Sequence, residues 1–178
     1  AELERAGLLD AVITQNVDRL HLAAGTRELV EVHGSIGSAV CLACGRVEDD
    51  VRPLLPLPRC ASCGAVLKPG VVMFGELLPV AAIERATELA RTAALLLVVG
   101  TSLEVWPVAG LPDETLAHGG LVAIVNREPT SVDRRARLVV HGSAAETLAA
   151  VLAGPRHARE AMAATISRCS RIATLHSA

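Results

Sequence analysis

Short apolar runs alternate with segments of helical periodicity along most of the chain. Three runs, residues 11–14, 95–99 and 121–125, are apolar at nearly every position, which is typical of strands buried on both faces of a parallel sheet. Residues 80–91 place their apolar side chains three or four positions apart, which predicts a helix. The other elements that we expect are strands at residues 29–33, 71–74 and 138–140 and helices at residues 1–6 and 143–152. The alternation predicts an α/β fold built on a parallel sheet.

The composition indicates a folded core and argues against several classes of protein. Hydrophobic residues make up 51% of the 178 residues and the mean hydropathy is +0.43, which excludes a disordered or fibrous chain. The formal net charge is −2, from 17 Lys and Arg against 19 Asp and Glu, and aromatic residues are 1%. Neither a basic surface nor a base-stacking platform is expected, so we predict no nucleic-acid partner.

We expect neither a membrane segment nor a secretory leader. The longest unbroken apolar run, Ala93–Val99, is much shorter than the roughly 20 residues that span a bilayer. The opening residues 1–5 are charged and helical in character rather than typical of a signal peptide. The sequence therefore predicts a soluble, cytoplasmic protein with no membrane partner.

Four cysteines form two pairs with the spacing of a metal site. Cys41 and Cys44 are separated from Cys60 and Cys63 by 15 residues, and each pair has the form CxxC. Two such pairs can place four thiolates around one Zn²⁺ at ~2.3 Å in a closed tetrahedron, which favours a structural ion. Two disulfides or a redox pair are alternatives, although nothing else in the sequence indicates an oxidising compartment. Because three prolines lie between the pairs, we expect residues 41–63 to form an irregular insert without a core of its own.

Polar residues follow three of the predicted strands, at the carboxyl ends where ligands of doubly wound sheets bind. These residues are Gln15, Asn16, Val17 and Asp18 after the first strand, Gly100, Thr101 and Ser102 after the strand at 95–99, and Asn126 and Arg127 after the strand at 121–125. Each loop alone could be an ordinary turn. Together, at one edge of the sheet, they predict a nucleotide pocket.

His33 is a candidate general base at the same edge. It ends the predicted strand at residues 29–33 and is followed by Gly34. Histidine takes up and releases protons near neutral pH, although a single histidine is more often a structural residue. The other five histidines, His21, His118, His141, His157 and His176, have helical or turn contexts and no partner motif, so we expect no role for them.

An ordered series of motifs begins at Thr14 and continues to Thr130, within a matching stretch of about residues 1–152. It comprises Thr14-Gln15-Asn16-Val17-Asp18-Arg19-Leu20-His21, His33-Gly34, the two CxxC pairs, Lys68-Pro69-Gly70-Val71-Val72-Met73-Phe74-Gly75-Glu76, Gly100-Thr101-Ser102-Leu103, Pro107, Leu111-Pro112, Asn126 and Pro129-Thr130. In this order, the series resembles the sirtuin family of NAD-dependent protein deacylases. Several motifs in the same order are far more specific than any one of them.

The resemblance implies a Rossmann-type NAD-binding domain at residues 1–34 and 71–153 and a zinc-binding small domain at residues 35–70. It implies NAD and one structural Zn²⁺ as cofactors, and an acylated-lysine protein or peptide as the partner. The acyl group would pass from lysine to ADP-ribose with release of nicotinamide. By the same resemblance, His33, Asn16 and Asp18 would be catalytic. NAD would contact Gln15, Asn16, Val17, Asp18, Gly100, Thr101, Ser102, Asn126, Arg127 and Ala144, and the acyl-lysine would contact Val72, Phe74, Gly75 and Glu76.

One segment of the family has no counterpart in these 178 residues. In the family, a Gly-rich strand-turn-helix with the pattern GAGxSxxSGIPxFR cradles the NAD phosphates, whereas the first motif here begins at Thr14. We therefore expect the carboxyl-terminal part of a sirtuin, with a sheet incomplete at its N-terminal side and exposed apolar strand edges. Residues 154–178 match no motif, and we expect an amphipathic helix or a frayed tail there. A non-catalytic zinc-ribbon interaction module and a mono-ADP-ribosyltransferase are alternative functions.

Overall fold

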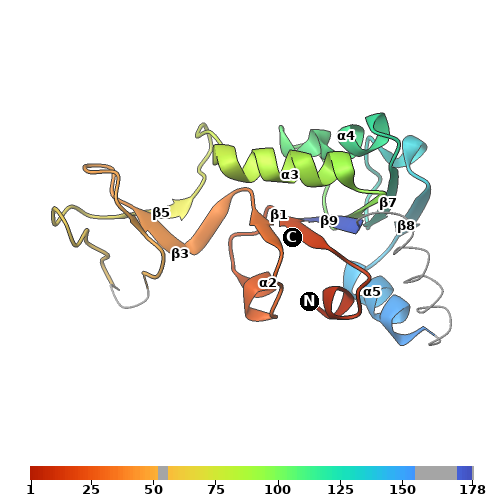
Figure 1. Ribbon diagram of the computed structural model, residues 1–178, viewed down its shortest axis with the longest axis horizontal. Helices are drawn as coiled ribbons and strands as arrows, with labels where there is room; N and C mark the ends of the chain where they lie inside the picture. The colour runs from red at the N-terminus through yellow and green to blue at the C-terminus, as the bar shows by residue number, and fades with distance from the viewer. Residues whose placement is uncertain (52–55, 155–171, 178) are drawn as a thin grey trace.

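The computed structural model describes residues 1–51, 56–154 and 172–177, which contain two sheets (Figure 1). The large sheet is parallel and consists of β1 (Ala11–Thr14), β2 (Leu29–Glu31), β6 (Leu95–Val99), β7 (Leu121–Asn126), β8 (Leu138–His141) and β9 (Ile172–His176). The small sheet is antiparallel and consists of β3 (Gly34–Val40), β4 (Val47–Glu48) and β5 (Lys68–Val71). The predicted α/β fold with a parallel sheet is confirmed.

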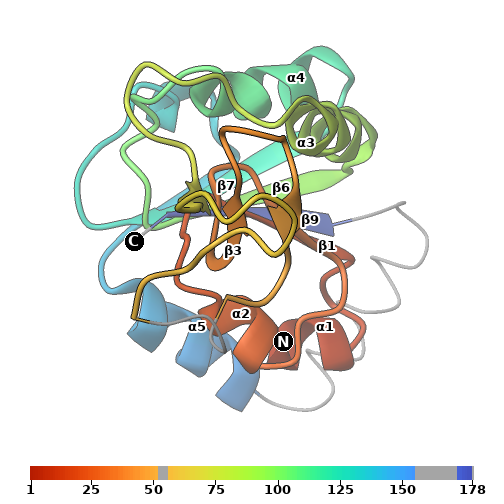
Figure 2. The same ribbon diagram turned by 90° about the vertical axis from the view of Figure 1, so that its left-hand side faces the viewer.

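Helices cover both faces of the large sheet. α3 (Val80–Thr92) and α4 (Leu111–Ala117) lie on one face, and α1 (Glu2–Arg5), α2 (Leu20–Ala23) and α5 (Ala144–Ala153) lie on the other (Figures 1 and 2). Two single turns of 3-10 helix, Val108–Gly110 and Asp133–Arg135, complete the set of described helices. The apolar runs of the sheet form the core between these layers, with Ile13, Leu96, Ile124 and Leu175 fully buried. None of the helices in the described part of the chain has the length and apolarity that crossing a membrane requires.

The centre of the large sheet is filled by its last strand in sequence. The strand order is β2-β1-β9-β6-β7-β8, and β9 pairs in parallel with β1 on one side and β6 on the other. In the usual 3-2-1-4-5-6 order of a doubly wound sheet, this central position belongs to the first strand. The expectation of exposed edges next to an absent strand is therefore wrong, because β1 and β6 are both hydrogen-bonded to β9.

β9 also corrects the prediction for the end of the chain. A helix or a frayed tail was the expectation for residues 154–178, but Ile172–His176 form a strand, while residues 155–171 lie outside the described residues. Asp10 holds the start of this strand, since its backbone N–H donates to the Ile172 carbonyl at 2.8 Å and its carboxylate accepts from the Ile172 N–H. The hydroxyl of Thr174 donates to the Leu97 carbonyl at 2.8 Å. Between two strands, a buried apolar segment satisfies its backbone groups without water.

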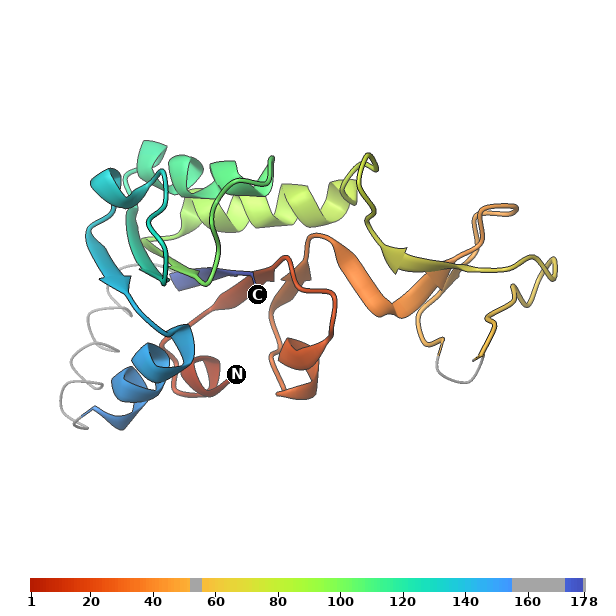
Figure 3. The same cartoon turned by 180° about the vertical axis from the view of Figure 1, so that it is seen from behind.

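The small sheet projects from one end of the large sheet (Figures 1 and 3). Its strand order is β4-β3-β5, and a cluster of buried side chains ties the cysteine segment to it. The cluster consists of Ala39, Cys41, Val51, Cys60 and Leu67. Three of these side chains come from residues 41–63 and pack against Ala39 and Leu67 at the flanks, so the segment is partly buried but, as expected, has no core made of its own residues alone.

The strand predicted at residues 71–74 ends early. β5 stops at Val71, and a turn follows in which the Glu76 N–H donates to the Met73 carbonyl at 3.0 Å. The Glu76 carboxylate accepts from the Met73 N–H at 2.9 Å. Gly75 has φ +84°, a conformation that favours glycine. The Val72 N–H still donates to the His33 carbonyl at 2.9 Å, and from Met73 onward the local hydrogen bonds replace a strand ladder.

Candidate active site

The polar loops that the sequence places at strand ends lie at one edge of the large sheet, because all six of its strands are parallel. From the position of β9, the chain builds β1 and β2 on one side and β6, β7 and β8 on the other. The strand order therefore reverses at β9. In a doubly wound sheet, ligands bind outside the carboxyl ends of the strands at this point.

A cavity of about 570 Å³ brings several predicted site residues together. It is lined by Gln15, Val17, His33, Val72, Met73, Phe74, Gly75, Glu76, Leu77, Leu78, Val105, Trp106 and Pro107. All four of the residues predicted to contact the acyl-lysine are among them, next to the predicted base His33. The structure thus places these residues together, while their roles stay predictions.

His33 has one ring nitrogen committed to the backbone. Its Nδ1 lies 3.3 Å from the carbonyl oxygen of Gln15, and because a carbonyl can only accept, Nδ1 carries the proton in the neutral ring. Nε2 is then an acceptor, which is the form that a general base requires. The next residue, Gly34, has φ +70°, and a Cβ there would overlap the Gly70 carbonyl oxygen, so the turn after His33 needs a glycine.

The side chains of the loop after β1 contact different parts of the molecule. Gln15 Nε2 donates to the hydroxyl of the buried Thr101 at 3.4 Å, which links two of the predicted NAD-binding loops. Asn16 Nδ2 lies 3.4 Å from Nδ1 of His176. Asp18 is exposed, and its carboxylate accepts from the Leu20 N–H at 2.9 Å at the start of α2. Of the loop's residues, Gln15 and Val17 line the 570 Å³ cavity.

A second cavity of about 360 Å³ lies on the other side of β9. It is lined by Gly100, Asn126, Arg127, Gly142, Ser143, Ala144, Ala145, His176 and Ser177. Four of these residues, Gly100, Asn126, Arg127 and Ala144, were predicted to contact NAD. Thr101 is buried, and Ser102 is exposed on the surface of the same loop.

The four cysteines of the two CxxC pairs converge on one point. Their Sγ atoms all lie within 4.8 Å of one another, and the Cys41–Cys63 and Cys44–Cys60 pairs are 3.4 and 3.5 Å apart. Four sulfurs at ~2.3 Å from one Zn²⁺ would be about 3.8 Å from each other, so the geometry is compatible with a structural zinc ion.

The two CxxC pairs, called hooks below, have the same backbone conformation. In each hook the glycine after the second cysteine has a positive φ, +75° at Gly45 and +73° at Gly64. The N–H of each glycine donates to the carbonyl of the first cysteine in its hook, at 2.8 and 2.9 Å. The N–H groups of Cys63 and then Ser62 lower the pKa of Cys60 to about 6. Backbone N–H groups that favour the charged form of a thiol suit a site that binds a metal through thiolates.

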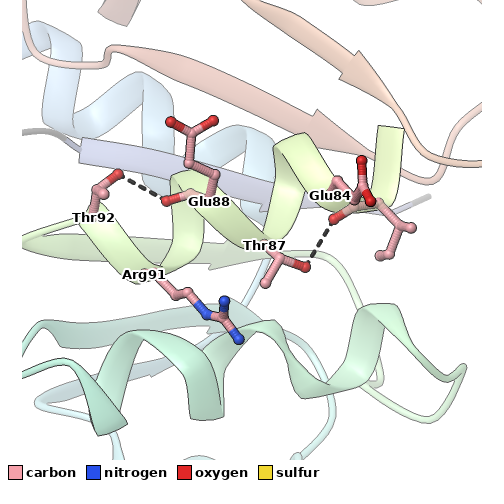
Figure 4. A pocket seen from close by; sticks show the side chains of 6 residues that line it. Glu84, Thr87, Glu88, Arg91 and Thr92 are labelled. Carbon is pink, nitrogen blue, oxygen red and sulfur yellow. Dashed lines mark hydrogen bonds between the residues drawn. The ribbon is translucent and has the colours of Figure 1, made fainter. Parts of the chain in front are cut away.

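Two further hollows are present among the described residues. One, of about 410 Å³, is formed entirely by side chains of α3 and includes Glu84, Glu88 and Arg91 (Figure 4). Its two threonine hydroxyls donate to carbonyls within the helix (Figure 4), so it offers an ordinary helix surface. The other, of about 390 Å³, is mainly apolar and lies against α1 and α5, and His21 and His176 also line it.

Sequence reasoning missed two kinds of site residue. Val105 and Trp106 line the 570 Å³ cavity, and His176 and Ser177 line the 360 Å³ cavity. The only tryptophan of the chain, next to a motif proline, was a signal for the first pair. The signal for the second pair was a short apolar run followed by polar residues, which is the pattern of the other strand ends. The expectation that His176 lies in a helical or turn context is wrong, because it ends β9.

A doubly wound parallel sheet with cavities at its switch point, joined to a small sheet that holds four clustered cysteines, defines a doubly wound α/β protein with a four-cysteine insert. The sequence profile of the Sir2 family matches residues 1–107. The chain belongs to this family.

Individual relatives agree with the assignment. An NAD-dependent protein deacetylase of Caldivirga maquilingensis is 43% identical over 162 residues, which cover 85% of this chain and 61% of that protein. An NAD-dependent protein deacylase of Ralstonia nicotianae is 49% identical over 145 residues, covering 80% of this chain and 58% of that protein. The crystal structure of a Sir2 homologue in complex with NAD has a TM-score of 0.80 at 38% identity, covering 91% of this chain and 63% of that chain. The chain thus spans about three fifths of the length of the curated relatives that it matches.

Proposed function

We propose that this chain carries the catalytic site of an NAD-dependent protein-lysine deacylase. The observation that carries the proposal is the position of His33, whose ring presents an acceptor nitrogen and lines a cavity together with the four predicted acyl-lysine residues. The solved structure of a relative, Sir2 bound to acetylated peptide, has a TM-score of 0.78 to this chain at 38% identity. The curated relatives carry the names of deacetylases and deacylases.

The residues present fit NAD because cavities flank the switch point of the sheet. NAD supplies the ribose carbon that accepts the acyl oxygen when nicotinamide leaves. Asn126, Arg127 and Ala144 would hold the adenosine half in the 360 Å³ cavity, and Gln15 would face the other half. His33, with its Nδ1 proton held by the Gln15 carbonyl, would take a proton from a ribose hydroxyl at Nε2.

The larger cavity suits an acylated lysine because its mouth is apolar and open. Phe74, Leu77 and Trp106 are large hydrophobic side chains that stand exposed around it. Such a lining favours an uncharged acyl chain over a free ammonium group. The position of Glu76 is fixed by the Met73 N–H and the Lys68 ammonium, which lower the pKa of its carboxyl.

The small sheet completes the proposal as a structural zinc module. Cys41, Cys44, Cys60 and Cys63 would hold one Zn²⁺ with no open position, so the ion would stabilise the small sheet rather than take part in the reaction. Four reduced thiols also suit a reducing compartment such as the cytoplasm, which cell fractionation would test.

Mass spectrometry of an acetyl-lysine peptide, incubated with the chain in the presence and absence of NAD, tests the function. We expect NAD-dependent loss of the acetyl group, reduced by about 10²–10⁴-fold in His33→Ala, the range that a general base contributes. His118→Ala is the matched control, because His118 caps the end of α4 and its Nδ1 contacts the Glu114 carbonyl.

Three outcomes would contradict parts of the proposal. Equal activity of His33→Ala and the wild type would refute the role of His33. A folded chain that binds no NAD in calorimetry would refute the enzyme and favour a protein-interaction module. ADP-ribose attached to an acceptor protein, with the acetyl group retained on the peptide, would favour mono-ADP-ribosyl transfer.

A further inference from the structure

The carboxyl end of β9 lies between the two cavities of the candidate active site. His33, which lines the larger cavity, comes from the side of the sheet that holds β1 and β2. The smaller cavity is lined by Asn126, which ends β7, and by Ala144, which follows β8. A dinucleotide that occupies both cavities must therefore cross the end of β9. In doubly wound sheets the diphosphate lies where the strand in this position ends, which here is His176.

Backbone hydrogen bonds fix His176 within the sheet. Its carbonyl accepts from the Gln15 N–H at 3.0 Å and from the Thr14 hydroxyl at 3.4 Å. The next residue, Ser177, donates its N–H to the Val99 carbonyl at 3.3 Å. The backbone at His176 is therefore held by two neighbouring strands, β1 and β6, which fixes the point from which the imidazole extends.

The contacts of the His176 ring define its tautomer. Nδ1 lies 3.1 Å from Nε2 of His21 and 3.4 Å from Nδ2 of Asn16, and the rings of the two histidines meet edge to face at 5.0 Å. An asparagine amide nitrogen can only donate, so Nδ1 of His176 accepts, and in the neutral ring the proton lies on Nε2. His21, which donates from its own Nε2, is a positioning residue for this arrangement.

The protonated nitrogen of His176 lies close to Gly100. A Cβ built on Gly100 would be 3.9 Å from Nε2, and both residues line the 360 Å³ cavity. Burial, and then the charge of His21, lowers the pKa of His176, so the ring is neutral near pH 7 and offers an N–H rather than a full charge.

We propose that His176 donates a hydrogen bond from Nε2 to the diphosphate of the bound dinucleotide. The proposal rests on the NAD binding proposed above and adds a residue that the sirtuin motifs do not contain. It gives the end of β9 part of the role that backbone N–H groups of a Gly-rich turn have in other doubly wound sheets.

Calorimetric titration with ADP-ribose and with adenosine tests this assignment. His176→Ala should bind ADP-ribose about 10- to 100-fold more weakly than the wild type, the loss expected for a hydrogen bond to a charged group. Adenosine, which has no phosphate, should bind equally well to both. His176→Gln, whose amide can place an N–H near the position of Nε2, should recover most of the lost affinity, and His118→Ala is the matched control.

Each result separates this assignment from the proposed function. Binding of ADP-ribose to His176→Ala with wild-type affinity would overturn the role of His176 and leave the proposed function intact. An equal loss of ADP-ribose and adenosine affinity would also overturn it, since the residue would then shape the adenosine pocket alone. A wild-type chain that binds neither ligand would overturn both proposals.

A nitrogen NMR measurement on the wild-type chain avoids any loss of folding in the variants. The His176 ring should show a protonated Nε2 in the free protein, and ADP-ribose should shift that signal while adenosine leaves it in place. A ring protonated on Nδ1 in the free protein, or a signal that ADP-ribose leaves unchanged, would refute the proposal.

Discussion

Leu175 offers the sharpest test of the position of β9 in the sheet. Its side chain is fully buried in the main hydrophobic core, and it pairs in register with Ile13 on β1 and Val98 on β6. Leu175→Ala removes the centre of this contact while leaving the backbone hydrogen bonds in place. Leu138→Ala, on the edge strand β8 where the side chain is 57% exposed, is the matched control.

The two substitutions should differ clearly in their effect on stability. Removing a fully buried leucine side chain costs the transfer free energy of its atoms and leaves a cavity that strands on both sides cannot close, for a total of about 2–5 kcal/mol. A largely exposed side chain should change the free energy of unfolding by about 0.5 kcal/mol or less. With a urea slope of about 2 kcal/mol/M, Leu175→Ala should lower the unfolding midpoint by roughly 1–2.5 M.

Urea unfolding followed by far-UV circular dichroism measures both midpoints. Equal slopes for the wild type and the variants would show that the free energies can be compared directly. A midpoint for Leu175→Ala within the range of Leu138→Ala would refute the reasoning, because the end of the chain would then contribute nothing to the core.

Three further changes test the metal centre, the end of β9 and the N-terminal segment. Cys60→Ser should abolish bound zinc in elemental analysis and unfold the small sheet, because structural zinc contributes about 10–16 kcal/mol in small zinc domains; retained zinc would contradict the site. Gly100→Ala should cost roughly 1–3 kcal/mol more than Gly119→Ala in urea unfolding, since both glycines have positive φ but only a Cβ at Gly100 meets a backbone oxygen, at 2.8 Å; equal losses would contradict this contact. Backbone N–H groups, first that of Glu28, lower the pKa of the buried Glu4, so its stabilising effect is present above the ordinary pKa of a glutamate and is lost as the pH falls through the lowered value. Glu4→Gln should therefore show a smaller acid-induced loss of stability, and an unchanged pH profile would argue against the role of this carboxylate.

The patterns of apolar residues predicted most of the helices and strands, because apolar residues mark the positions that are buried in the fold. The run at residues 95–99 is apolar since β6 is covered on both faces, and the periodicity at residues 80–91 corresponds to α3, which ends one residue later at Thr92. The cysteine spacing predicted a cluster that the structure shows. Residues 72–74 are the exception to these predictions. There the Glu76 carboxylate accepts from the Met73 N–H and Gly75 has a positive φ, so the chain forms a turn instead of continuing the strand.

The sequence predicted the candidate site only in part, because motifs identify residues but do not give their positions in space. His33 and the loop at residues 72–76 are distant in sequence, and the fold brings them to one cavity. Val105 and Trp106 belong to that cavity through their position after β6, for which the single tryptophan beside a motif proline was the only local signal. Asp18, another motif residue, does not line this cavity, and its carboxylate accepts a hydrogen bond from the Leu20 N–H at the start of α2.

The amino-acid sequence by itself determined the α/β class, the four-cysteine site and the family, because these depend on local periodicity, spacing and motif order. The tertiary structure alone decided that Ile172–His176 complete the sheet. Five residues are too few for their apolar pattern to distinguish a helix from a strand. Their pairing with β1 also joins positions about 160 residues apart in the sequence. Only the unfilled position between β1 and β6, with its unpaired backbone groups and apolar faces, selects the strand, and that position exists only once the rest of the sheet has formed.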